Sequence, residues 1–354
     1  MTVTYGFEHE RRLRAGFIGC GGHSFRNVYP VLRYLPVELV AVCDLDGERA
    51  ATYARTFGAE RSYTSHEAML RECELDCVFV VTGVSSYATL AVDCLSAGVS
   101  VWTEKPPVAS LDDVARIRAA LDASGKQYAV GLKKAFAPAN QKLRELTLRD
   151  DFGAVQSLAL RYAQFIPSVD DLRSKSELSD YFLDHLCHPL AVLRLLGGPV
   201  ASLFYERSPN GSGVATFTMA SGAIASLHLP FAFSMRSTQE RTEVNGERAS
   251  AWSENNTRVT FAPNPRFRDL HYGRDPDHTT DVHAMTVWEP EFSLGQLYNT
   301  GAFLLGYYGE LAHFCDAVLE DKPIEIGGID WAEEGIRIFD AFAEGPGKVI
   351  PVTA

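Results

Sequence analysis

Residues 13–24 read LRAGFIGCGGHS, and this stretch decides the fold. The apolar run from Leu13 to Ile18 has the composition of a buried β-strand, and the glycine-rich turn that follows it opens a helical pattern. A glycine-rich turn between a strand and a helix is typical of a β-α-β unit that binds a dinucleotide. The first third of the chain is therefore expected to build a nucleotide-binding sheet around this turn.

Strands and helices are expected to alternate along the first 131 residues. The predicted strands are 13–18, 39–43, 78–81, 100–102 and 128–130, and the predicted helices lie near 24–34, 46–57, 65–72, 86–97 and 111–124. Such alternation produces right-handed crossovers and a parallel sheet with helices on both faces. The fold class is therefore α/β, with an N-terminal doubly wound Rossmann domain assigned to residues 1–134.

The pattern changes after about residue 150, where strand-like runs are joined by hairpin signals. The predicted strands are 155–165, 200–206, 214–219, 224–229 and 241–244, the hairpin turns are Asn210-Gly211, Ser221-Gly222 and Asn245-Gly246, and helices are expected near 179–196 and 303–320. These features predict a C-terminal α+β domain, residues 135–354, with a mainly antiparallel open-faced sheet for substrate binding and oligomerisation. The irregular segment 263–297 is expected to be a lid or a subunit contact.

The overall charge excludes some classes of partner. Acidic residues (45) outnumber basic residues (33), which gives the 354 residues a formal net charge of -12 and disfavours nucleic acid and anionic membranes. No run approaches the about 20 apolar residues of a membrane span, and the start of the chain lacks an export signal. We therefore expect a cytoplasmic protein whose seven scattered cysteines are buried, reduced thiols.

The glycine turn and an acid after the second strand together predict the cofactor. Gly19 is expected to make the tight turn and Gly21 to let the backbone approach a pyrophosphate. Backbone N–H groups at the helix start, those of Gly22, His23 and Ser24, are expected to point at its charge. Asp44 stands 23 residues beyond Gly21, where a carboxylate binds ribose hydroxyls and repels a 2′-phosphate, so NAD is favoured over NADP. The alternative is that Asp44 only opens a turn.

A second constellation supplies acid and base groups. Glu104-Lys105-Pro106 follows the strand ending at Trp102, at the sheet edge where such folds bind ligands. Lys105 there is expected to stabilise a developing alkoxide, with Glu104 orienting it and Pro106 favouring a cis peptide. The other interpretation of these three residues is a plain loop before a helix.

Asp184 and His188 are four residues apart, so on a helix they share a face and the carboxylate orients the imidazole as a proton acceptor. His185 competes for that role. Pro189 either kinks the helix or marks its start, and in the second case the spacing argument fails.

With these residues in place, the chain resembles the glucose-fructose oxidoreductase, inositol dehydrogenase and MocA family (Gfo/Idh/MocA) over nearly its whole length. The matching residues are Gly19-x-Gly21-Gly22, Asp44, Glu104-Lys105-Pro106, Val130-Gly131 and Asp184-x-x-x-His188. The resemblance implies that Lys105, Asp184 and His188 line a site for a sugar, sugar derivative or cyclitol. It also implies a homodimer or homotetramer formed through the antiparallel sheet.

The sequence also offers further candidate contacts for the cofactor and the substrate. Thr82 is expected to contact the cofactor, although the loop after it, Gly83 to Tyr87, departs from the family's Thr-Pro-Asn-x-x-His. Lys133, Tyr162 and Gln164 are candidate substrate contacts near the domain junction. Trp252, Tyr272 and Trp288 have side chains suited to stacking on a sugar face, with packing in a core or an interface as the alternative.

The predicted function is transfer of a hydride between NAD and a secondary alcohol or ketone of a sugar or cyclitol, catalysed by Lys105, Asp184 and His188. Two alternatives stay open: an NAD-dependent glycoside hydrolase that shuttles hydride internally, and a non-catalytic regulator that binds a dinucleotide. No metal is expected, although His278-x-x-Asp281-x-His283 has residue types suited to zinc.

Overall fold

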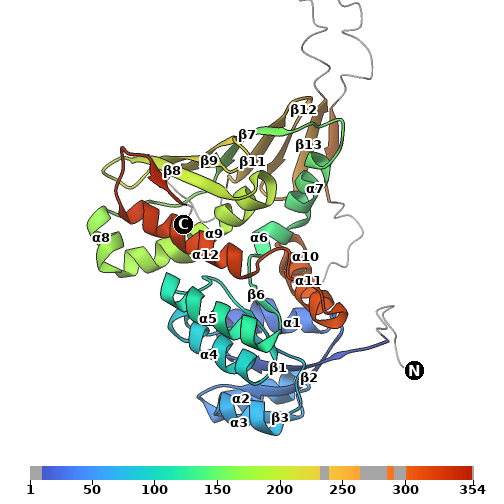
Figure 1. The fold of residues 1–354 in the computed structure, drawn as a ribbon. Coiled ribbons are helices and arrows are strands. Elements are labelled where there is room, and N and C mark those ends of the chain that lie inside the picture. Colours follow the sequence, from blue (N-terminus) through green and yellow to red (C-terminus); the bar gives the residue numbers. More distant parts are fainter. Residues whose placement is uncertain (1–9, 232–238, 264–284, 291–299, 353–354) are drawn as a thin grey trace, which may run out of the picture. The chain divides into compact units, whose positions relative to one another are not determined.

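The computed structural model describes residues 10–231, 239–263, 285–290 and 300–352, which form two compact units (Figure 1). Unit 1 comprises residues 1–136 and 299–336, and unit 2 comprises residues 137–298 and 337–354. Sequence analysis assigned all of residues 135–354 to the second domain. The structure differs, because residues 299–336 return to the first unit.

Unit 1 is built on a parallel sheet of six strands in the order β3-β2-β1-β4-β5-β6. The strands are β1 (Leu13–Ile18), β2 (Val37–Cys43), β3 (Arg61–Tyr63), β4 (Cys77–Val80), β5 (Ser100–Thr103) and β6 (Tyr128–Val130). Every residue of β4 and β5 is buried, as expected for strands covered by helices on both faces. This strand order reverses direction between β1 and β4, where doubly wound folds bind their ligands.

Helices join these strands and cover the sheet. They are η1 (Ser24–Val28, π-helical), α1 (Tyr29–Leu32), α2 (Gly47–Phe57), α3 (His66–Glu72), α4 (Val84–Ser96), α5 (Leu111–Ser124) and α6 (Lys133–Phe136). Capping side chains mark several starts: Asp46, Ser65 and Ser110 each accept a hydrogen bond from a backbone N–H in the first turn. The predicted helices are confirmed to within a few residues, and β3 is a strand that the pattern did not predict.

The returning segment explains the domain difference. It contains α10 (Thr300–Leu304), α11 (Tyr307–Glu320) and the start of α12 (Ile329–Ala343). On α11, Leu311 and Phe314 are fully buried in the same apolar cluster as Phe17, Phe79 and Trp102 of the parallel sheet. The ring of Phe314 lies 5.7 Å from that of Phe79 in an edge-to-face arrangement. Helix α11 therefore completes the core of unit 1.

Unit 2 contains a mixed sheet of nine strands in the order β14-β13-β12-β11-β7-β10-β9-β8-β15. The strands are β7 (Val155–Arg161), β8 (Val200–Arg207), β9 (Gly213–Met219), β10 (Ile224–Leu229), β11 (Arg241–Gly246), β12 (Ala249–Glu254), β13 (Arg258–Pro263), β14 (Thr286–Trp288) and β15 (Ile350–Pro351). Strands β7 and β10 pair in parallel and the other pairs are antiparallel. The predicted mainly antiparallel sheet is confirmed.

One face of this sheet packs against helices. The helices wholly within unit 2 are α7 (Pro138–Thr147), α8 (Val169–Ser174) and α9 (Glu177–Gly197). On β9 and β10, Ala215 and Leu227 are buried, whereas their neighbours Val214 and Ile224 point to the other face and are exposed. Among the described residues, no helix is both long and apolar enough to cross a membrane.

Candidate active site

The glycine-rich turn opens a cavity of about 710 Å³ at the carboxyl edge of the unit 1 sheet. Gly19 has φ +106°, and a Cβ there would lie 2.0 Å from the carbonyl oxygen of Val81, so only glycine fits. At Gly21 a Cβ would meet no atom within 4 Å, which leaves the backbone open to the cavity. An open backbone at the start of a helix fits a pyrophosphate.

Asp44 lies in the same cavity and follows β2. Its Oδ2 accepts a 2.7 Å hydrogen bond from the backbone N–H of Cys20, and its Oδ1 accepts a 2.9 Å bond from the N–H of Asp46. These two bonds fix the carboxylate, and each oxygen keeps a lone pair for a ribose hydroxyl. The guanidinium of Arg49 is 3.7 Å from Oδ1. The cavity thus has the two features that a dinucleotide requires, an open glycine turn and a fixed acid.

Two other predicted cofactor contacts lie in or beside this cavity. Thr82 lines it, and its hydroxyl is 2.8 Å from that of Ser86. Ser24 is buried, and its hydroxyl donates to the carbonyl oxygens of Gly19 and Gly21. Ser24 therefore stabilises the glycine turn through its side chain.

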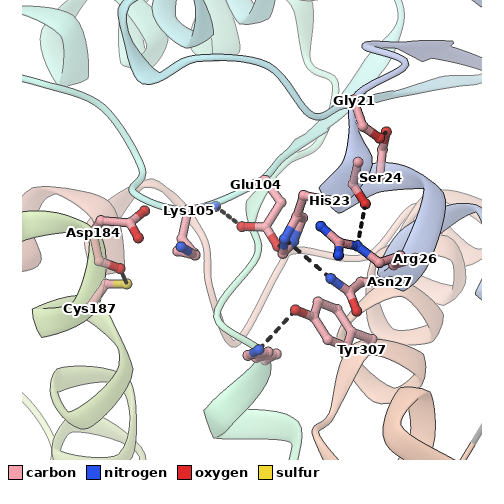
Figure 2. A network of polar contacts seen from close by, with 12 residues as sticks. Gly21, His23, Ser24, Arg26, Asn27, Glu104, Lys105, Asp184, Cys187 and Tyr307 are labelled. Carbon is pink, nitrogen blue, oxygen red and sulfur yellow. Dashed lines mark hydrogen bonds and ion pairs between the residues drawn. The ribbon is translucent and has the colours of Figure 1, made fainter. Parts of the chain in front are cut away.

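Glu104 is a buried carboxylate, 2% exposed, placed immediately after β5. Its Oε2 accepts a 2.6 Å hydrogen bond from the backbone N–H of Lys105, and its Oε1 lies 3.0 Å from Nε2 of His23 (Figure 2). Asn27 donates to Nδ1 of His23 at 3.2 Å, so the imidazole proton sits on Nε2 and is donated to Glu104. Glu104 thus links the glycine turn to Lys105. The Lys105–Pro106 peptide is cis, as the sequence predicts.

A buried cluster of charged groups lies beside Glu104 in unit 1. Lys133, on α6, donates a 2.8 Å hydrogen bond to the hydroxyl of Tyr307 on α11, and its Nζ lies 4.4 Å from the ring centroid. Burial lowers the pKa of Lys133, and the charges of Glu104 and Glu310 oppose that shift. Lys133 therefore contacts α11, and the substrate contact expected of it stays a prediction.

In unit 2, α9 runs unbroken from Glu177 to Gly197 with Pro189 inside it, so Asp184 and His188 lie one turn apart on one helix. Oδ2 of Asp184 is 3.5 Å from Nδ1 of His185, the competing histidine. His188 is buried, and its ring lies 6.3 Å from that of Tyr162. The helix that the spacing argument requires is therefore present, whereas the orientation of His188 by Asp184 stays a prediction.

Tyr162 and Gln164 follow β7 on the same unit. Burial raises the pKa of Tyr162, with smaller contributions from nearby acidic groups. Gln164 is buried, and its Nε2 forms no hydrogen bond with the residues that the structure describes. A buried amide without a partner costs free energy, which is a reason to expect a polar ligand or water there.

The remaining residues are those that the sequence did not predict and the candidate stacking aromatics. Asn27, Tyr307 and Glu310 were not predicted as parts of the site. Asn27 contacts His23 four residues before it, whereas Tyr307 and Glu310 lie near Lys133 only through tertiary packing. Of the three candidate stacking aromatics, Trp252 packs under the guanidinium of Arg241 and Trp288 under Lys142, both in unit 2. Tyr272, the His278, Asp281 and His283 cluster and most of segment 263–297 lie outside the described residues.

Comparison with known proteins shows the family of this chain. Residues 13–132 match the model of the oxidoreductase family GFO_IDH_MocA, NAD-binding Rossmann fold, and residues 140–252 match the GFO/IDH/MocA C-terminal domain. The chain belongs to this family. The resemblance drawn from the sequence is thereby confirmed, and so is its fold class.

Curated relatives match part of this family member. D-apiose dehydrogenase of Paraburkholderia graminis is 29% identical over 209 residues, 58% of this chain and 55% of that protein. A D-xylose 1-dehydrogenase (NADP(+)) of Haloferax volcanii is 27% identical over 187 residues, 52% of this chain and 57% of that protein. The matched segments thus span little more than half of these relatives. A solved dehydrogenase from Chromobacterium violaceum shares the fold, with a TM-score of 0.77 and 22% identity over 94% of both chains.

Proposed function

We propose that this Gfo/Idh/MocA protein is a dehydrogenase that transfers a hydride between NAD and a secondary alcohol or ketone of a sugar, sugar derivative or cyclitol. The observation that carries the proposal is the pair Glu104 and Lys105 in unit 1. The buried carboxylate of Glu104 holds the backbone of Lys105 just after β5, and it also binds His23 of the glycine turn, whose cavity contains Asp44 and fits a dinucleotide. Relatives named as dehydrogenases of D-apiose and D-xylose support a sugar as the substrate class.

Each residue has a chemical role in this proposal. NAD, when bound, supplies the hydride acceptor. The Lys105 ammonium binds the carbinol oxygen and stabilises the negative charge that develops on it. His188 accepts the hydroxyl proton, and Asp184 orients the imidazole for that transfer. Tyr162 and Gln164 are proposed to contact the substrate, and His23, Ser24 and Thr82 the cofactor.

NAD is proposed as the preferred cofactor over NADP. The Asp44 carboxylate is fixed by the N–H groups of Cys20 and Asp46, so it cannot turn away from a ribose 2′-substituent without breaking both bonds. A fixed negative charge there repels a 2′-phosphate. Arg49 pairs with Asp44 and Asp46 and is therefore partly neutralised.

Oligomer formation through the open face of the unit 2 sheet is part of the proposal. Val214 and Ile224 are exposed on neighbouring strands of that face. Apolar side chains on an uncovered sheet face favour pairing with a second copy. A reducing, cytoplasmic location is proposed because all seven cysteines are free thiols.

The test is NADH formation by the purified protein with NAD and a panel of sugars, amino sugars, nucleotide sugars and cyclitols, with NADP in parallel. Turnover of at least one panel member, faster with NAD than with NADP, is the expected result. Cleavage of a chromogenic glycoside without net NADH would instead indicate the internal hydride shuttle. Bound NAD with neither activity would contradict the enzymatic proposal and favour a dinucleotide-binding regulator.

A further inference from the structure

Glu310 is a buried carboxyl group in unit 1. It lies in the first turn of α11 and is 2% exposed. Neither carboxyl oxygen forms a hydrogen bond with the described residues. A buried carboxyl group without a hydrogen-bond partner is costly, and more so when it is ionised, because it has lost its hydration. A residue of this kind is expected to serve a purpose other than stability.

The neighbours of Glu310 are charged. Glu104 and Lys133 both act electrostatically on it, and both belong to unit 1. The other charged or titratable groups around this pair are His23, just before η1, Lys105 in the loop after β5, Lys134 on α6 and Tyr307 on α11 itself. Of the charged groups, Glu104 raises the pKa of Glu310 and Lys133 lowers it.

Hydrogen bonding and burial distinguish the two carboxyl groups. Glu104 accepts hydrogen bonds from the N–H of Lys105 and from His23, and hydrogen bonds to both oxygens stabilise a carboxylate. Glu310 has no such bonds with the described residues. An ionised Glu310 would be a buried charge without a hydrogen bond to the described residues, and the Glu104 carboxylate would repel it. Burial, and after it the charge of Glu104, raises the pKa of Glu310 well above its ordinary value, and Lys133 opposes this only in part.

We propose that Glu310 is a positioning residue that keeps its proton in the folded protein, so that Glu104 is the ionised member of the pair and holds Lys105 and His23 in place. The inference rests on the proposed function, because Lys105 is the catalytic residue that it positions. Loss of the Glu310 proton at alkaline pH would put a second negative charge beside Lys133. Lys133 would then be drawn toward Glu310, and the environment of Glu104 and Lys105 would change.

Infrared spectroscopy tests the proton directly. The variant is Glu310→Gln, which has the shape of the neutral acid and cannot ionise, and the control is Glu320→Gln, an exposed glutamate in the last turn of the same helix. The wild type and the control are expected to show the carbonyl band of a protonated carboxyl at neutral pH, shifted in D2O, and Glu310→Gln is expected to lack it. Absence of the band from the wild type would overturn the proposal.

Stability against pH is a second readout that does not require activity. A raised pKa means that the folded state binds the Glu310 proton more tightly than the unfolded state, so the wild type loses stability as pH rises above the ordinary value of 4.5 toward the folded pKa. Glu310→Gln lacks this loss, and its Tm is expected to exceed the wild-type Tm increasingly over that range. Parallel Tm curves for Glu310→Gln and wild type would overturn the proposal.

The dependence of kcat on pH tests the positioning role, through the fall in kcat on the alkaline side of the curve. That fall is expected to move to higher pH in Glu310→Gln and to stay in place in Glu320→Gln, an outcome that a purely structural role would not produce. A fall at the same pH in Glu310→Gln would overturn the positioning role. If no substrate is turned over, the proposed function fails, while the infrared band and the Tm curves still decide the state of Glu310.

Discussion

The backbone N–H of Lys105 donates a 2.6 Å hydrogen bond to the carboxylate of Glu104, the residue before it in the chain. Because Glu104 is buried and also binds His23, the start of the Lys105 side chain is fixed relative to the glycine turn. This bond fixes the backbone from which the proposed catalytic lysine extends. This relationship motivates the first prediction.

Replacing Lys105 by methionine should keep the bulk of the side chain and remove its charge. We expect NAD binding to persist and kcat to fall by about 10²- to 10³-fold, the loss typical of removing one group that stabilises a developing oxyanion. Steady-state kinetics and NAD titration by protein fluorescence measure the two effects. Lys126→Met, at an exposed position of unit 1, is the matched control and should behave like the wild type. Equal kcat values for the two variants would show that Lys105 has no catalytic role.

Replacing Asp44 by asparagine should weaken NAD binding and narrow the preference for NAD over NADP. The amide keeps the shape of the carboxylate but removes the charge that repels a 2′-phosphate. Its NH2 group cannot accept a hydrogen bond, so one of the two bonds from the N–H groups of Cys20 and Asp46 is lost. Kd values for both dinucleotides, measured by calorimetry, give the ratio. A ratio unchanged from the wild type would contradict the role assigned to Asp44.

Gly19→Ala should destabilise the protein more than Gly58→Ala. Both glycines have positive φ, at +106° and +79°, but a Cβ at Gly19 would collide with the Val81 carbonyl, whereas at Gly58 nothing lies within 4 Å. We expect a loss of roughly 1 kcal/mol at Gly58, from backbone strain alone, and of more than about 2 kcal/mol at Gly19. Urea denaturation measures both. Equal losses would mean that the turn relaxes around the new Cβ.

Cys20 should resist alkylation although it lies in the glycine turn. Burial raises the pKa of its thiol to about 12, so the reactive thiolate is scarce at neutral pH. Mass spectrometry after iodoacetamide treatment should find Cys73, which is partly exposed, modified before Cys20. Modification of Cys20 should accelerate as pH rises toward 12. Rapid labelling of Cys20 at pH 7 would contradict this account of its burial.

Local sequence patterns predicted much of the fold but not its tertiary closure. The apolar strands β1 and β4, and the turn at Gly19, are local features, so their type and order followed from the chain itself. Helix α11 was also predicted, but a helical period does not state which sheet its apolar face will cover, and Leu311 and Phe314 pack into unit 1.

In the candidate site, too, the residues in local motifs were predicted and those brought together by tertiary contacts were not. Asp44 and Lys105 follow strands at the expected edge, and Asp184 and His188 share a helix because Pro189 does not end it. Glu310 and Tyr307 were not predicted, because they are far from Lys133 in the sequence. Tyr307, which binds Lys133, is 174 residues away from it. Short sequence motifs do not predict contacts between residues so far apart in the sequence.

The most direct test of the central claim follows one hydrogen atom. A sugar or cyclitol found to be a substrate is prepared with deuterium on its carbinol carbon and incubated with the enzyme and NAD, and the dinucleotide product is analysed by mass spectrometry. The account predicts NADH that carries the deuterium, together with a primary isotope effect whenever hydride transfer limits the rate. Reduced dinucleotide without the label, or product formed with no change in the dinucleotide, would contradict it.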